Sequence, residues 1–223
     1  MPDMRFAMLC LALAANFPFP ASAQGIYAAD GFGATASYSS GDIGTYGVDL
    51  GYVAKGRLEL GLGFSQSSDS ELKATNITPR LAIYALRAKE GLPVTLSLST
   101  SYGATSYSGD ALEELQAFIP DADISGSTFS FGGDLTMHMQ LFEVAALLPT
   151  VSIRRAIIKL ELTGYGGTEK NSVNGTSFLV GLPIAISAGE SRVLHLGPTF
   201  ELLTADGESD GAIGFRAGLV LVR

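Results

Sequence analysis

The chain has 223 residues, a net charge of −8 and one cysteine, with 47% hydrophobic and 16% charged residues. An acidic sequence without a cluster of lysines or arginines is a poor candidate for nucleic-acid binding or for attachment to an anionic lipid surface. The one cysteine, Cys10, lies in the N-terminal apolar run. The sequence that follows has no cysteine, which excludes a disulfide framework, a thiol nucleophile and cysteine metal sites there. The 27 glycines, with scattered serine and threonine, favour strands and tight turns over helical bundles.

Residues 1–23 have the pattern of a secretory signal peptide. Arg5 gives a positive start, and the apolar run that follows spans about ten residues, too short for the ~20 of a membrane-spanning helix. The small residues at 21–23 predict cleavage between Ala23 and Gln24. We therefore expect a cleaved signal at 1–23 and one domain at 24–223.

Apolar and polar residues alternate along most of this domain, with the period of two typical of β-strands. In 57–65, for example, Leu58, Leu60, Leu62 and Phe64 share one face and oppose Glu59. The fourth and seventh segments lose strict alternation, which a β-bulge would explain. We predict ten strands, or eight if some of these segments merge. The ten segments are 31–40, 44–54, 57–66, 75–87, 93–104, 126–140, 149–163, 175–187, 192–203 and 211–222.

The links between these segments also alternate in character. Links near 55–56, 88–92 and 188–191 are tight, whereas those near 67–74, 105–125, 164–174 and 204–210 are longer and hold 11 of the 22 acidic residues. Link 141–148 is apolar and fits neither kind. Short turns at one end and long loops at the other are typical of transmembrane barrels, with the short turns in the periplasm. The fold prediction is all-β, a closed antiparallel up-and-down transmembrane barrel with both chain ends on the periplasmic side.

This pattern resembles that of the small outer-membrane β-barrel proteins of Gram-negative bacteria, such as OmpA, OmpX and OmpW. The resemblance rests on the signal, the strands of nine to twelve residues and the final strand GFRAGLVLV. It implies insertion into outer-membrane lipid by the barrel assembly machinery. Family members usually end in an aromatic residue, whereas this chain ends in Arg223 and has no tryptophan for an aromatic girdle.

A soluble periplasmic barrel of lipocalin type is the alternative, because it alternates with the faces inverted, apolar inside and polar outside. The polar face of this chain is mostly Gly, Ser and Thr, with less charge than a water-exposed surface normally carries. The membrane barrel is therefore the preferred prediction.

If the apolar residues face lipid, the polar face lines the lumen. A barrel of eight to ten strands is narrow, and charges of mixed sign inside it most simply pair with one another. This predicts a lumen closed by side chains, and a narrow porin or passive channel for ions or small solutes is the alternative. The predicted lumen residues include Asp49, Glu59, Asp134, His138, Arg154, Lys159, Glu161, His195, Glu201 and Arg216.

The two histidines raise the question of an enzyme. Asp134 and His138 lie four residues apart on one strand, separated by ~13 Å, which is too far for a hydrogen-bonded acid/base pair. No G-x-S-x-G elbow or H-E-x-x-H motif is present. We predict no catalytic residues and no cofactor; catalysis would require His138 or His195 close to both a carboxylate and a serine.

Two further segments depart from the strand pattern. Asp206, Glu208 and Asp210 are spaced like calcium ligands, but the twelfth position is Ala217, so a solvated hairpin tip is favoured over a metal site. Residues 110–120 have helical spacing of apolar residues within the loop 105–125. We predict a short helix that caps the barrel mouth, with a surface partner as the alternative. The function predicted overall is a non-enzymatic outer-membrane protein with a structural or surface-interaction role.

Overall fold

The computed structural model describes residues 30–222 apart from short gaps at 42–43, 69–70, 89–92, 165, 190 and 206–207. The predicted signal peptide and its cleavage site at Ala23 and Gln24 lie outside the described residues. Thirteen strands form one sheet, and ten of them are long. The long strands are β1 (Gly31–Ser40), β2 (Gly44–Ala54), β3 (Leu58–Ser68), β4 (Lys73–Leu86), β5 (Val94–Ser108), β6 (Asp123–Met137), β9 (Thr150–Gly164), β10 (Gly167–Gly181), β12 (Arg192–Ala205) and β13 (Glu208–Val222).

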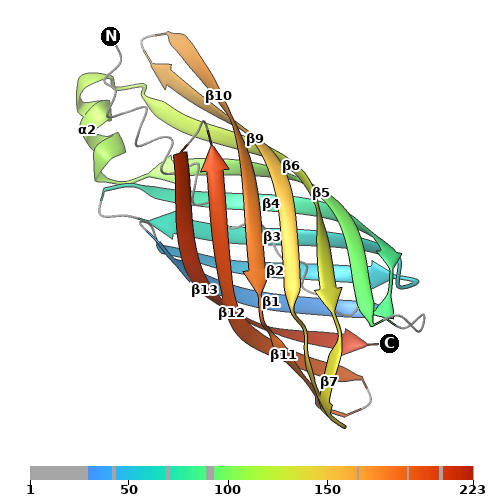
Figure 1. Cartoon of the computed structure of the whole chain (residues 1–223). Helices are drawn as coiled ribbons and strands as arrows, with labels where there is room; N and C mark the ends of the chain where they lie inside the picture. The colour runs from blue at the N-terminus through green and yellow to red at the C-terminus, as the bar shows by residue number, and fades with distance from the viewer. Residues whose placement is uncertain are drawn as a thin grey trace.

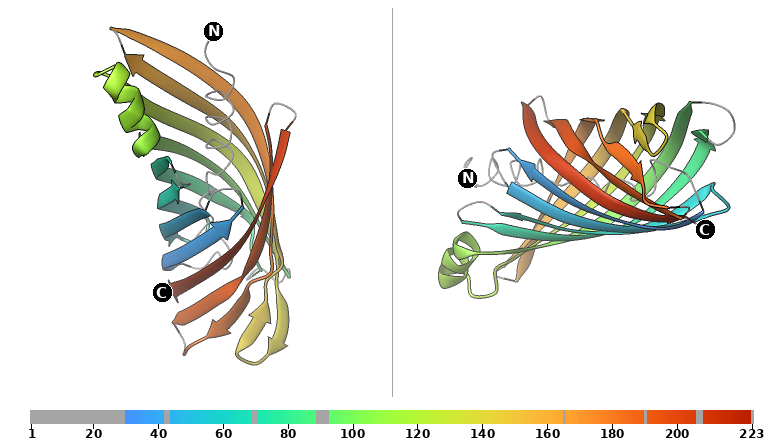
Figure 2. Two further views of the ribbon diagram at one scale, coloured as in Figure 1. Left: turned by 90° about the vertical axis from the view of Figure 1, so that its left-hand side faces the viewer. Right: turned by 90° about the horizontal axis from the view of Figure 1, so that it is seen from below.

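These ten strands close into an antiparallel up-and-down barrel, as the sequence predicted (Figure 1). Each strand pairs with the next in chain order, and β1 pairs with β13 from Gly31↔Val222 to Ser40↔Ile213. Both described chain ends therefore lie at the same end of the barrel, which we call the terminal end. Figure 2 shows the strands strongly tilted around the barrel axis, as barrel closure requires.

Three short strands extend the sheet at the terminal end. They are β7 (Met139–Phe142), β8 (Ala145–Leu147) and β11 (Ile184–Ser187). β7 pairs with β8, β8 with β11, and β11 with β12, so the apolar link 141–148 is a β-hairpin that continues the sheet. Pro149 and Pro183 stand where β8 meets β9 and β10 meets β11, because proline cannot donate to the ladder.

The side chains alternate as predicted, with apolar residues outward. Leu58, Leu60 and Leu62 are 41%, 59% and 50% exposed, while Glu59 between them is fully buried. Polar side chains point inward along the same strands, among them Thr45, Asp49 and Ser65. This is the inverse of a lipocalin-type barrel, in which the apolar side chains would fill the interior.

Of the two segments expected to contain a β-bulge, one is irregular and the other is not. β4 carries the suspected irregularity, because its register with β5 shifts between Tyr84 and Leu86. β9 does not: its pairing with β6 and β10 runs without a register shift over its whole length. All four links expected to be long are shorter than predicted, since the strands that follow them begin earlier, at Lys73, Asp123, Gly167 and Glu208.

The turn between β2 and β3 shows why the terminal-end links are short. Lys55 and Gly56 have φ values of 51° and 60°, the positive pair of a type I′ turn, whose twist matches that of the flanking strands. Lys55 accepts a strained conformation there, whereas Gly56 adopts it without cost.

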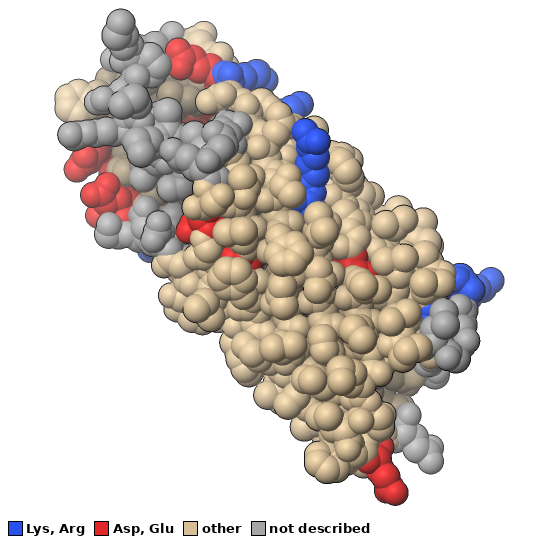
Figure 3. Space-filling model, in the orientation of Figure 1, with Lys and Arg blue, Asp and Glu red and all other residues tan. Residues whose placement is uncertain are grey.

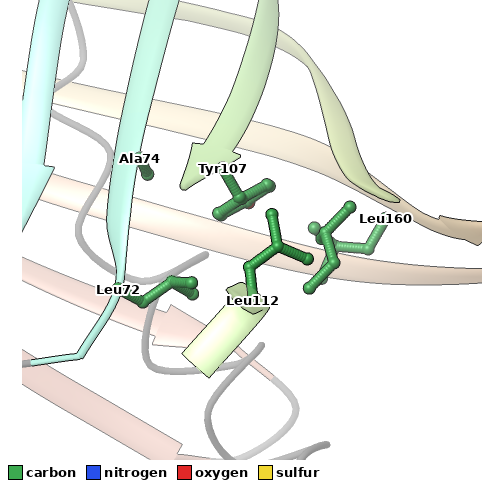
Figure 4. Close-up of a cluster of buried hydrophobic side chains, with 6 residues drawn as sticks. Leu72, Ala74, Tyr107, Leu112 and Leu160 are labelled. Atoms are coloured by element: carbon green, nitrogen blue, oxygen red, sulfur yellow. The ribbon is translucent and has the colours of Figure 1, made fainter. Parts of the chain in front are cut away.

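The predicted helix is present as α2 (Asp110–Phe118), at the end of the barrel opposite Gly31 and Val222, where the first and last strands pair (Figure 1). Its Leu112 packs among inward-facing residues of four strands, and these form an apolar cluster (Figure 4). Asp110 and Glu113 lie in the first turn, where their negative charges interact favourably with the positive end of the helix dipole. Within the described residues, no helix is long and apolar enough to cross a membrane. The buried cluster around α2 comprises Leu72, Ala74, Tyr107, Leu112, Ile124 and Leu160.

Candidate functional site: the barrel interior

A buried ion pair lies between neighbouring strands β3 and β4. Glu59 lies opposite Ala82, and Arg80 and Tyr84 flank Ala82 on either side. The Arg80 guanidinium donates to one carboxylate oxygen of Glu59 and the Tyr84 hydroxyl donates to the other. The side chains of Arg80 and Glu59 are 3% and 0% exposed. Both carboxylate oxygens thus accept from a strong donor, as a buried charge requires.

A second buried pair joins β6 and β9. Arg154 Nη2 lies 2.7 Å from Asp134 Oδ1, and the Ser97 hydroxyl of β5 donates to Asp134 Oδ2 at 3.1 Å. On β12, Glu201 accepts a hydrogen bond of 3.0 Å from the Ser177 hydroxyl of β10.

Asp49 and Arg216 add one charge of each sign to the interior. Asp49 is buried on β2, and Arg216 is partly exposed on the inward face of β13. The lumen charges are therefore of mixed sign, and two of the carboxylates, Glu59 and Asp134, are held in ion pairs.

Several large lumen side chains pair across the ladder with a glycine. Arg80 lies opposite Gly61, Arg154 opposite Gly132 and His195 opposite Gly218. A Cβ at Gly218 would lie 2.3 Å from His195 Nε2, and one at Gly132 would lie 2.6 Å from Arg154 Cγ. Each polar side chain thus extends over a neighbouring strand where no side chain obstructs it.

The two histidines lie on different parts of the sheet, and each contacts a threonine. His195 is buried, and its Nε2 lies 3.4 Å from Thr35 Oγ1, across Gly218 of the intervening strand. His138 lies between β6 and β7 at the terminal end, with its Nε2 3.0 Å from Thr95 Oγ1. Threonine hydroxyls are the described hydrogen-bond partners of both imidazoles.

The remaining lumen wall is built largely of small hydroxyl side chains that bond across adjacent strands. Ser101 and Ser130 lie 2.7 Å apart, Thr45 and Ser67 2.9 Å, and Thr136 and Thr150 3.0 Å, as measured between their hydroxyl oxygens. Apolar clusters lie at both ends of this polar wall. One surrounds Leu112 at the α2 end, and the other combines Leu148, Ala185, Val193 and Val220 at the terminal end.

The structure places eight of the ten predicted lumen residues on the inward face: Asp49, Glu59, Asp134, His138, Arg154, His195, Glu201 and Arg216. The predictions for Glu161 and for Lys159 are wrong. Since β9 has no bulge, its odd-numbered residues share the outward face, where Glu161 pairs with the exposed Lys170 at 2.8 Å.

Arg80 is the lumen residue that the sequence prediction missed. It alternates with Ile77, Leu81 and Ile83, so the period of two in the fourth segment carried the signal. In the candidate calcium segment, Asp206 lies outside the described residues, and Glu208 and Asp210 belong to β13. The part of the chain that the structure describes contains no group of three or more His, Cys, Asp or Glu side chains arranged to hold a metal.

No protein-family model matches this sequence, and no curated protein does. Among solved structures, the barrel is similar to the translocator domain of the autotransporter NalP from Neisseria meningitidis, with 15% identity, a TM-score of 0.51 and coverage of 99% of this chain and 95% of that domain. The β domain of the Bordetella autotransporter BrkA has 11% identity and a TM-score of 0.48, and the match covers 87% of this chain and 100% of that domain. The outer-membrane protease OmpT from Escherichia coli has 10% identity and a TM-score of 0.40, and the match covers 87% of this chain and 94% of the protease. The chain therefore has the fold of an outer-membrane β-barrel.

Proposed function

We propose that this protein is a non-enzymatic outer-membrane barrel whose lumen is closed by its own side chains and which acts at the outer surface. The observation that carries the proposal is the two interior ion pairs, Glu59 with Arg80 and Asp134 with Arg154, each between adjacent strands. Ion pairs of this kind fix the strands against one another and neutralise the charges that form them.

The outer face supports a location in the membrane. Large apolar side chains cover it on every long strand, including Tyr52, Leu60, Phe131 and Leu219, each more than one third exposed. Apart from lipid, such a surface would need an extensive protein partner to cover it. The closed ladder also satisfies the backbone groups internally, which the hydrocarbon region requires.

The ends of the barrel support closure. At the α2 end Leu112 fills part of the mouth, and at the terminal end Val53 packs on Tyr84 beside the cluster of Leu148 and Val220. Apolar clusters at a constriction exclude water and so oppose ion passage.

We assign no catalytic role to the interior, because the Glu59 and Asp134 carboxylates that could act as acid or base are engaged in ion pairs with arginines. The surface role is assigned to the loop 105–125. α2 presents the exposed acids Glu113 and Glu114 to solvent, and Phe118 is 79% exposed at its end. An exposed aromatic among carboxylates suits contact with a partner protein.

A narrow passive channel is the second candidate. Glu201 and Arg216 are partly exposed rather than fully buried, and partly exposed Ser37 and Thr199 lie on the same wall. This wall of β1, β12 and β13 would be the path of any conduction.

Fractionation tests the location. We expect the mature chain to begin at Gln24, to require detergent for extraction, and to show heat-modifiable migration after insertion by the barrel assembly machinery. Recovery in a soluble periplasmic fraction would overturn the proposal.

Planar-bilayer recordings test the closed lumen. We expect no steady current from the purified barrel over a range of voltages. A current that changes with Arg216→Gln but not with Lys170→Gln, which removes an exposed charge outside the lumen, would replace the closed-lumen account with the channel.

A further inference from the structure

β9 carries two basic side chains on its outward face, directly beside the lumen residues of the same strand. Arg154 is buried inside the barrel, while Arg155 and Lys159 are exposed outside it. Figure 3 shows Lys and Arg side chains following the upper part of β9, on a face that is otherwise largely uncharged. Because the side chains of a strand alternate, Arg155 and Lys159 share the outward face while Arg154 faces inward.

The cross-strand neighbours place Arg155 at the upper edge of the apolar face. Two residues toward the terminal end, Ile153 pairs with Phe178, and both are more than one third exposed. Arg155 itself lies between Phe131 and Thr176. One row further from the terminal end, Ile157 pairs with Phe129, which is 45% exposed. The surface of β6, β9 and β10 therefore changes from apolar to polar between Arg155 and Lys159.

The surface above that level is rich in hydrogen-bond donors. Lys159 lies between Ser127 and Ser172, and Asn174 and Thr176 face outward on β10 beside them. Arg155 and Lys159 are ~13 Å apart along the strand, within the combined reach of two long side chains toward one group between them.

Charge balance on this face is incomplete. Glu161, the acidic residue of the same strand face, pairs with Lys170 at 2.8 Å. Neither Arg155 nor Lys159 makes an ion pair or a hydrogen bond among the described contacts of its side chain. Two cations at the edge of a lipid-facing surface thus lack an anion from the protein.

We propose that Arg155 and Lys159 bind the phosphorylated headgroup of a lipid in the outer leaflet. Guanidinium groups bind phosphate with paired hydrogen bonds, and basic residues at a membrane interface attract anionic headgroups. The lipid is favoured over a soluble anion because the cations share their face with Ile153 and Phe178, which would contact the acyl chains of the same molecule. The inference rests on the proposed outer-membrane location, in which the end opposite the termini faces outward.

The test uses the purified, folded full-length barrel in detergent and native mass spectrometry. The probes are bisphosphorylated lipid A, the same lipid without phosphates, and inorganic phosphate as a competitor. The variant Arg155→Gln/Lys159→Gln removes both cations. The control variant Lys73→Gln/Arg192→Gln removes the same charge from two exposed positions, one at each end of the barrel.

We expect the double variant to bind bisphosphorylated lipid A roughly 30-fold more weakly, at about fivefold for each cation, and the control to match the wild type. Equal binding by the double variant, or equal binding of the lipid without phosphates, overturns the inference. Displacement of the lipid by inorganic phosphate at equal concentration would assign the site to a free anion instead.

Folding is read from heat-modifiable migration of each variant. If the double variant does not fold, Arg155→Gln and Lys159→Gln are tested singly, and each is expected to lose about fivefold. Failure of the proposed location appears separately, as a soluble mature protein in the fractionation, and does not depend on lipid A binding.

Discussion

The buried pair of Glu59 and Arg80 makes a quantitative prediction about stability. Arg80→Met leaves the Glu59 carboxylate, which is 0% exposed, without its guanidinium partner. Breaking a buried ion pair by removing one partner costs about 3–5 kcal/mol, because an uncompensated charge remains in a site shielded from water. With a urea m value of about 2 kcal/mol per M, the unfolding midpoint should fall by about 1.5–2.5 M.

The companion variants separate the pair from its surroundings. Glu59→Leu should cost a similar amount, whereas Glu59→Leu/Arg80→Met should cost less than the sum of the two single changes by about 1–3 kcal/mol. Lys170→Met is the matched control, since it breaks the pair with Glu161, whose side chains are 67% and 39% exposed. Exposed pairs contribute about 0–1 kcal/mol.

The measurement is urea unfolding of the refolded barrel, followed by circular dichroism and by heat-modifiable migration. The reasoning is refuted if Arg80→Met lowers the midpoint no more than Lys170→Met does. It is also refuted if the single and double variants are additive, because the two side chains would then be energetically independent.

Three further changes probe other parts of the barrel. Gly218→Ala places a Cβ against His195 and the backbone of β1, so we expect a loss of about 1–3 kcal/mol in the same urea assay; an unchanged midpoint contradicts it. Leu62→Arg puts a charge on the lipid-facing surface near the middle of β3, which costs about 2–4 kcal/mol near the bilayer midplane and should reduce equilibrium folding into vesicles. Leu112→Ala removes the anchor of α2, so limited proteolysis should cleave the loop 105–125 faster while the barrel keeps its migration; equal cleavage rates would exclude the cap.

The strands were predictable because lipid and lumen impose opposite demands on alternate residues. In β3, Leu58, Leu60 and Leu62 must face lipid, and Glu59 between them can face only the interior. The helix α2 was predictable for a similar reason, since Leu112 recurs with its apolar neighbours at helical spacing inside a loop.

Strand register was not available from the sequence. The tight turn at Lys55 and Gly56 fixes how β2 pairs with β3, but β3 and β4 are joined by a longer link that sets no register. The contact of Glu59 with Arg80 depends on that register, so the pair could not be derived even after both residues were placed on strands.

The facing of residues in the second half of β9 could not be predicted from its sequence. Its sequence places Arg154 and Arg155 side by side, and an irregular alternation left open a bulge that would have turned Lys159 and Glu161 inward. The continuous ladder decides otherwise, since pairing on both sides of β9 proceeds without a shift. A strand held by two neighbours along its whole length has little freedom to accommodate an extra residue.

Two identical side chains on β9 consequently meet opposite environments. Arg154 extends over Gly132 to reach Asp134, so its charge is neutralised by the protein itself. Arg155 lies at the apolar edge with no described partner from the chain, so its charge must be met by water or by a ligand. The same reasoning distinguishes the lumen from the surface as places for function. Inside, Glu59 and Asp134 are neutralised by arginines of adjacent strands, and these pairs fix the barrel. Outside, the unmatched charge of Arg155 and Lys159 is available to bind something other than the protein.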